Sequence, residues 1–128
     1  VRTAKKVLGE KLFLVSDSMS FVGAKTNKLI IEGTEITFKD GRCINSNGDF
    51  AGTSLTMLDA VQNAVNYVGI ELKEALRMAS LYPAQSIGME NELGRIKEGY
   101  RADLVVFDNK ISVKGVMSYG NLEMFSSK

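Results

Sequence analysis

The sequence predicts an α/β chain with a β appendage, and three patterns carry this prediction. An unbroken apolar run at residues 12–15 is typical of a strand covered on both faces. Apolar residues recur at helical spacing between residues 55 and 79. Two regions, 29–44 and 102–125, are rich in β-branched and apolar residues and are interrupted by turn signals. The predicted order is therefore helix, strand, hairpin strands, helices and strands.

The first segments predict half of a βαβ unit. Residues 1–8 are expected to form the end of a helix that stops at Gly9, and a buried strand at 12–16 follows almost at once. Parallel strands need a helical crossover, so we expect a preceding strand outside the chain and the chain to be part of a larger protein. Asp17 stands directly after the strand, where a carboxylate either caps a turn or takes part in chemistry.

The middle of the chain predicts a small antiparallel sheet. A loop at 18–27 precedes two or three strands within 29–44, and a further turn leads into residues 50–54. The expected turn positions contain glycine, alone or beside Asp or Asn, and they are Gly23, Gly33, Asp40-Gly41 and Asn47-Gly48-Asp49.

Two helices and a short third one are predicted next. The first begins near Ser54, with Thr53 or Ser54 as its cap, and ends at Gly69. The second covers residues 72–79 and ends before Pro83. Pro83 is expected to open a short helix at residues 84–87, which Gly88 closes. Three strands, at 102–108, 111–117 and 122–125, complete the prediction.

Composition excludes several classes of function. The 16 basic and 15 acidic residues are interspersed, which argues against a nucleic-acid footprint or a membrane-surface patch. No apolar run reaches the roughly 18 residues of a spanning helix. The single cysteine, Cys43, indicates a reducing compartment and favours the cytoplasm. Because there is no histidine, a complete His-based metal site or Ser/His triad is not available within this chain alone.

Several motifs resemble a known family. Residues 83–88, with the pattern PA-x-x-x-G, and residues 94–108, which contain G-x-I-x-x-G and ADLVVFD, resemble the C-terminal signature of the amidohydrolase superfamily. Within it, LVSDSM with Gly23, the loop GDFAGTSLTM at 48–57 and LRMASLYPA at 76–84 look like the N-acetylglucosamine-6-phosphate deacetylases. The resemblance covers essentially the whole chain, but only the C-terminal third of such an enzyme. Ser18 is a small departure, since the family often has alanine there.

The resemblance implies a fold and a division of the chain. That family has a (β/α)8 TIM barrel with a small β-sandwich built from both chain ends. Residues 1–101 would be the C-terminal part of the barrel, with its eighth strand at 12–16, a β-hairpin insertion and the closing helices. Residues 102–128 would supply C-terminal strands of the sandwich.

The resemblance also implies a metal-dependent deacetylation of N-acetylglucosamine 6-phosphate. Asp17 would be the catalytic aspartate, which takes a proton from metal-bound water and delivers one to the departing nitrogen. Phe50, Ala51 and Gly52 would line the acetamido-sugar pocket. The divalent metal, zinc or iron, would be held by residues outside this chain, in the remaining N-terminal part of the enzyme. A neighbouring subunit would bind the sugar phosphate, which implies a homodimer, and we expect the isolated chain to be inactive.

Other readings stay open for the remaining residues. Ser54 and Thr56 are better explained as helix caps than as nucleophiles, and Cys43 as a packing residue. Asp103 and Asp108 suit turns and strand ends. The methionines expected to fill the core are Met57, Met78, Met89 and Met117. Two rival functions remain: a dihydroorotase-like or imidazolone-hydrolysing amidohydrolase, and a non-catalytic structural or binding module.

Overall fold

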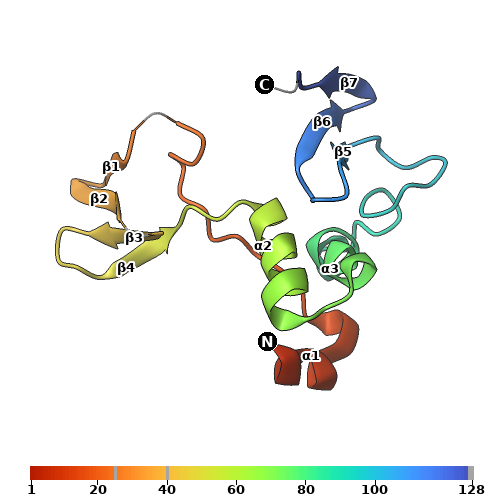
Figure 1. Cartoon of the computed structure of the whole chain (residues 1–128), viewed down its shortest axis with the longest axis horizontal. Coiled ribbons are helices and arrows are strands. Elements are labelled where there is room, and N and C mark those ends of the chain that lie inside the picture. Colours follow the sequence, from red (N-terminus) through yellow and green to blue (C-terminus); the bar gives the residue numbers. More distant parts are fainter. Residues whose placement is uncertain (25, 40, 127–128) are drawn as a thin grey trace. The chain divides into compact units, whose positions relative to one another are not determined.

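The computed structural model describes residues 1–24, 26–39 and 41–126, and it contains helices and two antiparallel sheets (Figure 1). The chain divides into two compact units. The larger unit comprises Val1–Leu14 and Val61–Lys128, and the smaller unit comprises Val15–Ala60. The mixed helix and sheet content confirms the predicted class at this level.

The smaller unit is built on a four-stranded antiparallel sheet with the order β1-β2-β3-β4 (Figure 1). Its strands are β1 (Lys28–Ile31), β2 (Thr34–Lys39), β3 (Arg42–Asn45) and β4 (Phe50–Thr53). Glu32 and Gly33 form the tight β1–β2 turn with φ of 50° and 81°, the left-handed geometry for which glycine is suited. The predicted turn at Gly33 is confirmed, whereas the prediction for Asp40 lies outside the described residues.

The strand β4 is one more than the two or three predicted. A register shift between Cys43 and Ile44 lets Cys43 pair with Gly52 and Ile44 with Phe50. The segment that follows the predicted turn at 47–49 thus becomes a strand, since β3 offers it a free edge. The core of this unit consists of Phe21, Ile36 and Cys43.

The helical part of the larger unit confirms three predicted segments. Helix α1 (Arg2–Leu8) is followed by a 3₁₀ turn, η1 (Gly9–Lys11), and helix α3 (Leu72–Ala79) lies where expected. The helix predicted from Ser54 is α2 (Met57–Asn63), which continues as a π-helical turn, η2 (Ala64–Val68), to Gly69. The buried residues that hold these elements together are Val61, Ala64, Ala75, Met78, Leu81 and Tyr82.

Of the residues predicted as helix caps, the structure uses Thr56 at the start of α2, and not Thr53 or Ser54. The Thr56 hydroxyl accepts a hydrogen bond from the Asp59 N–H (3.1 Å), and the Asp59 carboxylate accepts one from the Thr56 N–H (2.9 Å). This reciprocal pair satisfies two groups at the start of α2. Thr53 does not cap the helix, because it is the last residue of β4 and pairs in the sheet.

The short helix at Pro83 begins earlier than predicted. Helix α4 runs over Leu81–Ser86, so Pro83 is its third residue rather than its opening one. Proline is tolerated there because the first N–H groups of a helix have no intrahelical partner.

The expected buried strand at 12–16 does not form within the described part of the chain. Residues 12–17 belong to no sheet within the described part of the chain, and Val15 is 67% exposed. One backbone bond, from the Leu14 N–H to the Met78 carbonyl (2.9 Å), connects this segment to α3. An apolar run needs neighbouring strands to form a ladder, and no described residues supply them here.

The three predicted C-terminal strands are confirmed, with shifted ends. The larger unit contains an antiparallel sheet of β5 (Leu104–Phe107), β6 (Val113–Ser118) and β7 (Asn121–Met124) (Figure 1). Asp103 accepts a hydrogen bond from the Tyr119 N–H (2.8 Å), and Asp108 accepts one from the Lys110 N–H (2.9 Å). Both carboxylates therefore have the turn and strand-end roles predicted for them. Among the described residues, no helix is long and apolar enough to cross a membrane.

Candidate functional site

Asp17 is an exposed residue at the N-terminal side of the smaller unit's loop. Its φ is 53°, in the left-handed region that non-glycine residues seldom adopt. Its carbonyl oxygen accepts a hydrogen bond from the Thr53 N–H (2.9 Å), and the Met19 N–H donates to the Thr53 carbonyl (2.9 Å). Asp17 is thus held against the end of β4.

The predicted substrate residues form β4 rather than a loop. The Phe50 side chain is 61% exposed, Ala51 is half-buried and Gly52 is buried. A Cβ on Gly52, which has φ of 123°, would stand 2.8 Å from the Met19 sulfur and 3.1 Å from the Asp17 carbonyl oxygen. Glycine is required here by this close packing.

The structure therefore brings Asp17 to Gly52, one of the three predicted substrate residues. Asp17 lies far from Phe50–Gly52 in the sequence, but the Thr53 bond joins the two segments within the smaller unit. The contact between Gly52 and the Asp17 carbonyl places their backbones side by side. An exposed carboxylate thus adjoins a strand whose first residue presents an exposed aromatic ring.

Cys43 lies in the core of the smaller unit and pairs with Gly52 of β4. Its side chain is fully buried, which supports the packing role predicted for it. Burial raises the pKa of the Cys43 thiol, and the Asp17 carboxylate adds to the rise. Since the thiolate is the reactive form, Cys43 is unsuited to act as a nucleophile.

Metal-binding groups do not gather in this part of the chain. Within residues 1–24, 26–39 and 41–126, no group of three or more Asp, Glu, Cys or His side chains is placed to hold an ion. The carboxylate of Asp17 alone does not make a metal centre, because such sites need several ligands. The described residues therefore do not form a metal centre by themselves.

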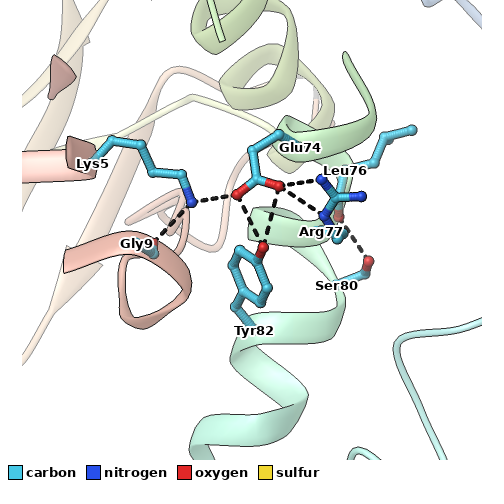
Figure 2. Close-up of polar contacts among 7 residues, drawn as sticks. All are labelled: Lys5, Gly9, Glu74, Leu76, Arg77, Ser80 and Tyr82. Carbon is cyan, nitrogen blue, oxygen red and sulfur yellow. Dashed lines mark hydrogen bonds and ion pairs between the residues drawn. The ribbon is translucent and has the colours of Figure 1, made fainter. Parts of the chain in front are cut away.

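A second polar cluster, which the sequence did not predict, lies in the larger unit. Figure 2 shows the Glu74 carboxylate of α3 between Lys5 of α1 and Arg77, with the Tyr82 hydroxyl below it. Arg77 approaches to 2.5 Å and the Tyr82 hydroxyl donates at 3.0 Å. The hydrogen bond from Lys5, assisted by Arg77 and Tyr82, lowers the pKa of Glu74 to about 2 although burial opposes it.

This Glu74 cluster joins helices instead of forming a reaction centre. Lys5 also donates to the Gly9 carbonyl (2.8 Å), so its ammonium is already used at the end of α1. Only the Glu74–Arg77 spacing of three residues is visible in the sequence. The contacts with Lys5 and Tyr82 depend on how α1, α3 and α4 pack.

Two open hollows occur among the described residues of the larger unit. One, of about 510 Å³, is lined by η1, Phe13 and α4, and the other, of about 760 Å³, is lined by α1, the Gly69 turn and α3. Neither contains Asp17 or Phe50.

Comparison with known proteins identifies relatives along nearly the whole chain. The model of the amidohydrolase family matches residues 1–123. N-acetylglucosamine-6-phosphate deacetylase of Haemophilus influenzae is 42% identical over 122 residues, which cover 94% of this chain and 32% of that protein. N-acetylgalactosamine-6-phosphate deacetylase of Escherichia coli O157:H7 is 33% identical over 116 residues, covering 91% of this chain and 31% of that protein.

Solved structures agree with these sequence matches. The crystal structure of N-acetylglucosamine-6-phosphate deacetylase from Pasteurella multocida matches with a TM-score of 0.91 and 40% identity, over 97% of this chain and 33% of that one. The enzyme of the same name from Thermotoga maritima matches with a TM-score of 0.81 and 30% identity, over 94% and 33%. The chain thus spans about a third of the length of these relatives. From the match over residues 1–123, we conclude that the chain belongs to the amidohydrolase family.

Proposed function

We propose that this chain is the C-terminal third of an enzyme that hydrolyses the acetamide of N-acetylglucosamine 6-phosphate, giving glucosamine 6-phosphate and acetate. The names of the relatives in Haemophilus influenzae and Pasteurella multocida support this substrate. The observation that carries the proposal is the backbone contact of Asp17 with Gly52 and Thr53, because it places an acid–base group against the strand that begins with Phe50.

In this proposal Asp17 is the catalytic acid–base. Its exposed carboxylate would take a proton from the attacking water and return one to the departing sugar nitrogen. Phe50, Ala51 and Gly52 would contact the acetamido sugar, the phenyl ring through its apolar face and the strand through peptide groups.

The proposed architecture is the one that the family resemblance implies. Residues 1–101 would belong to a (β/α)8 barrel, in which strands from the rest of the enzyme pair with residues 12–16, and residues 102–128 would join a small β-sandwich. The missing ladder at 12–16 is compatible with this assignment, since the neighbouring strands would come from outside the chain. A divalent metal, zinc or iron, would take its ligands from that remaining part. A homodimer would complete the phosphate site.

The proposal is tested with a chimera in which this chain replaces the matching third of the Haemophilus influenzae relative. We expect the chimera to release acetate from N-acetylglucosamine 6-phosphate. Asp17→Asn should lower kcat by at least about 100-fold, because general acid–base catalysis contributes factors of this size or more. Glu35→Gln is the matched control, since Glu35 pairs with Lys28 (3.0 Å) on an exposed strand and such pairs contribute little.

The outcomes separate the alternatives. A folded chimera that leaves the acetamide intact but hydrolyses dihydroorotate or an imidazolone would replace this function with another amidohydrolase activity. Faster turnover of N-acetylgalactosamine 6-phosphate would change the assigned sugar. A chimera without hydrolase activity would favour the structural module. The 128-residue chain by itself should release no acetate, and metal-dependent release by it would contradict the division of the site proposed here.

A further inference from the structure

Thr53, the last residue of β4, contacts residues 16–19 through three polar groups. Its N–H donates to the Asp17 carbonyl (2.9 Å), and its carbonyl accepts from the Met19 N–H (2.9 Å). Its hydroxyl donates to the Ser16 carbonyl (2.6 Å). One residue of the sheet therefore holds the peptide groups on both sides of Asp17.

A second set of bonds fixes the Thr53 hydroxyl itself. The Leu55 N–H donates to this oxygen (3.0 Å), and the Leu55 carbonyl accepts from the Ser18 hydroxyl. With one bond donated and one accepted, the hydroxyl has a defined orientation. We call this set of contacts the Thr53 clamp; its members are Ser16, Asp17, Ser18, Met19, Thr53 and Leu55.

The clamp surrounds the unusual backbone of Asp17. A non-glycine residue with φ of 53° carries a conformational cost, and it persists where neighbouring contacts impose it. The direction of a short side chain such as aspartate follows its backbone closely. Release of the clamp would let residue 17 return to ordinary φ values and would turn its carboxylate away.

We propose that Thr53 is a positioning residue for Asp17, holding the backbone geometry from which the carboxylate reaches the substrate. The inference deepens the proposed function and rests on it, because it requires Asp17 to act as the acid–base. Gly52 makes the clamp possible, since a side chain there would meet the Met19 sulfur and the Asp17 carbonyl.

The test uses the chimera with Thr53→Val, which keeps the side-chain shape and the peptide groups but removes the hydroxyl. We expect kcat to fall by about 10- to 100-fold, as when a reacting group is displaced by about an ångström, while KM stays nearly unchanged. Thr53→Ser restores the hydroxyl and should restore kcat. Thr37→Val in β2 of the same sheet is the matched control and should behave as the unsubstituted chimera.

A readout without catalysis keeps the inference falsifiable. In the chimera, amide hydrogen exchange at Met19 and Thr53 should quicken in Thr53→Val but not in Thr53→Ser, relative to the Phe38 amide of β2, which donates to the Asn27 carbonyl (2.8 Å). Melting temperatures are compared so that kcat is read on folded protein.

Three outcomes overturn the inference. The first is a kcat of Thr53→Val equal to that of the control, and the second is a serine variant as slow as the valine variant. The third is unchanged exchange at Met19 in Thr53→Val. In each case an active chimera that still depends on Asp17 leaves the proposed function standing. An inactive unsubstituted chimera, by contrast, removes both.

Discussion

Replacement of Glu74 by glutamine should weaken the larger unit in a pH-dependent way. The pKa of Glu74 falls from its ordinary value of 4.5 to about 2, with Lys5 as the main cause, and its side chain is only 19% exposed. Each pKa unit corresponds to about 1.4 kcal/mol, so the charged form of Glu74 stabilises the folded state by about 3 kcal/mol at neutral pH.

The sign of the effect follows from the lowered pKa. The folded state binds the Glu74 proton less tightly than the unfolded state, so the stabilisation is complete above about pH 4.5 and is lost as the pH falls towards 2. Glu74→Gln should therefore lower the free energy of unfolding by about 3 kcal/mol at pH 7 and by about 1.4 kcal/mol at pH 3.

Urea unfolding followed by helix circular dichroism, at pH 7 and pH 3, measures both values. The difference between variant and unsubstituted chain cancels the titration of other groups. Glu71→Gln, an exposed position three residues earlier, is the matched control and should change stability by less than about 0.5 kcal/mol. A loss in Glu74→Gln that is the same at both pH values would refute the electrostatic reasoning.

Three further outcomes are expected. Met78→Ala should lower the free energy of unfolding by about 2–5 kcal/mol in urea titrations, because the fully buried side chain leaves a cavity. Thr56→Ala should cost about 1 kcal/mol by the same measurement and Ser54→Ala much less, since Thr56 is the cap that contacts Asp59; equal losses would contradict this. Cys43 should react slowly with a thiol reagent at pH 7 and rapidly in urea, because burial and a raised pKa suppress its thiolate; fast reaction of the folded chain would contradict its placement.

Local signals predicted most of the regular elements. The helix at 72–79 has its apolar residues at helical spacing, and the turn at Gly33 has residues suited to a two-residue hairpin, so each is specified within a few positions. The strand β4 was missed, and the choice of Thr56 among the candidate caps stayed open, for one reason. Thr53, Ser54 and Thr56 are equally suitable caps by residue type, and only the edge of β3 decides that Thr53 pairs in a sheet.

The sequence identified residues of the candidate site but not the contacts that they make. Asp17 and Phe50–Gly52 were selected by resemblance, and their roles remain predictions. Nothing in the local sequence of Thr53 indicates that its hydroxyl contacts Ser16, and nothing near Lys5 indicates Glu74 as its partner. Both contacts join segments that are far apart along the chain, so they exist only after the elements pack.

The sequence by itself determined the mixture of helices and sheets, most of the individual elements, and the family resemblance, because periodicity, turn residues and motifs act over short distances. The tertiary structure alone decided that Asp17 adopts a left-handed backbone beside Gly52, and that Glu74 lies between Lys5 and Tyr82. It also decided that the apolar run at 12–16 lies outside any sheet of the described residues, because a strand needs a neighbouring strand with which to form hydrogen bonds.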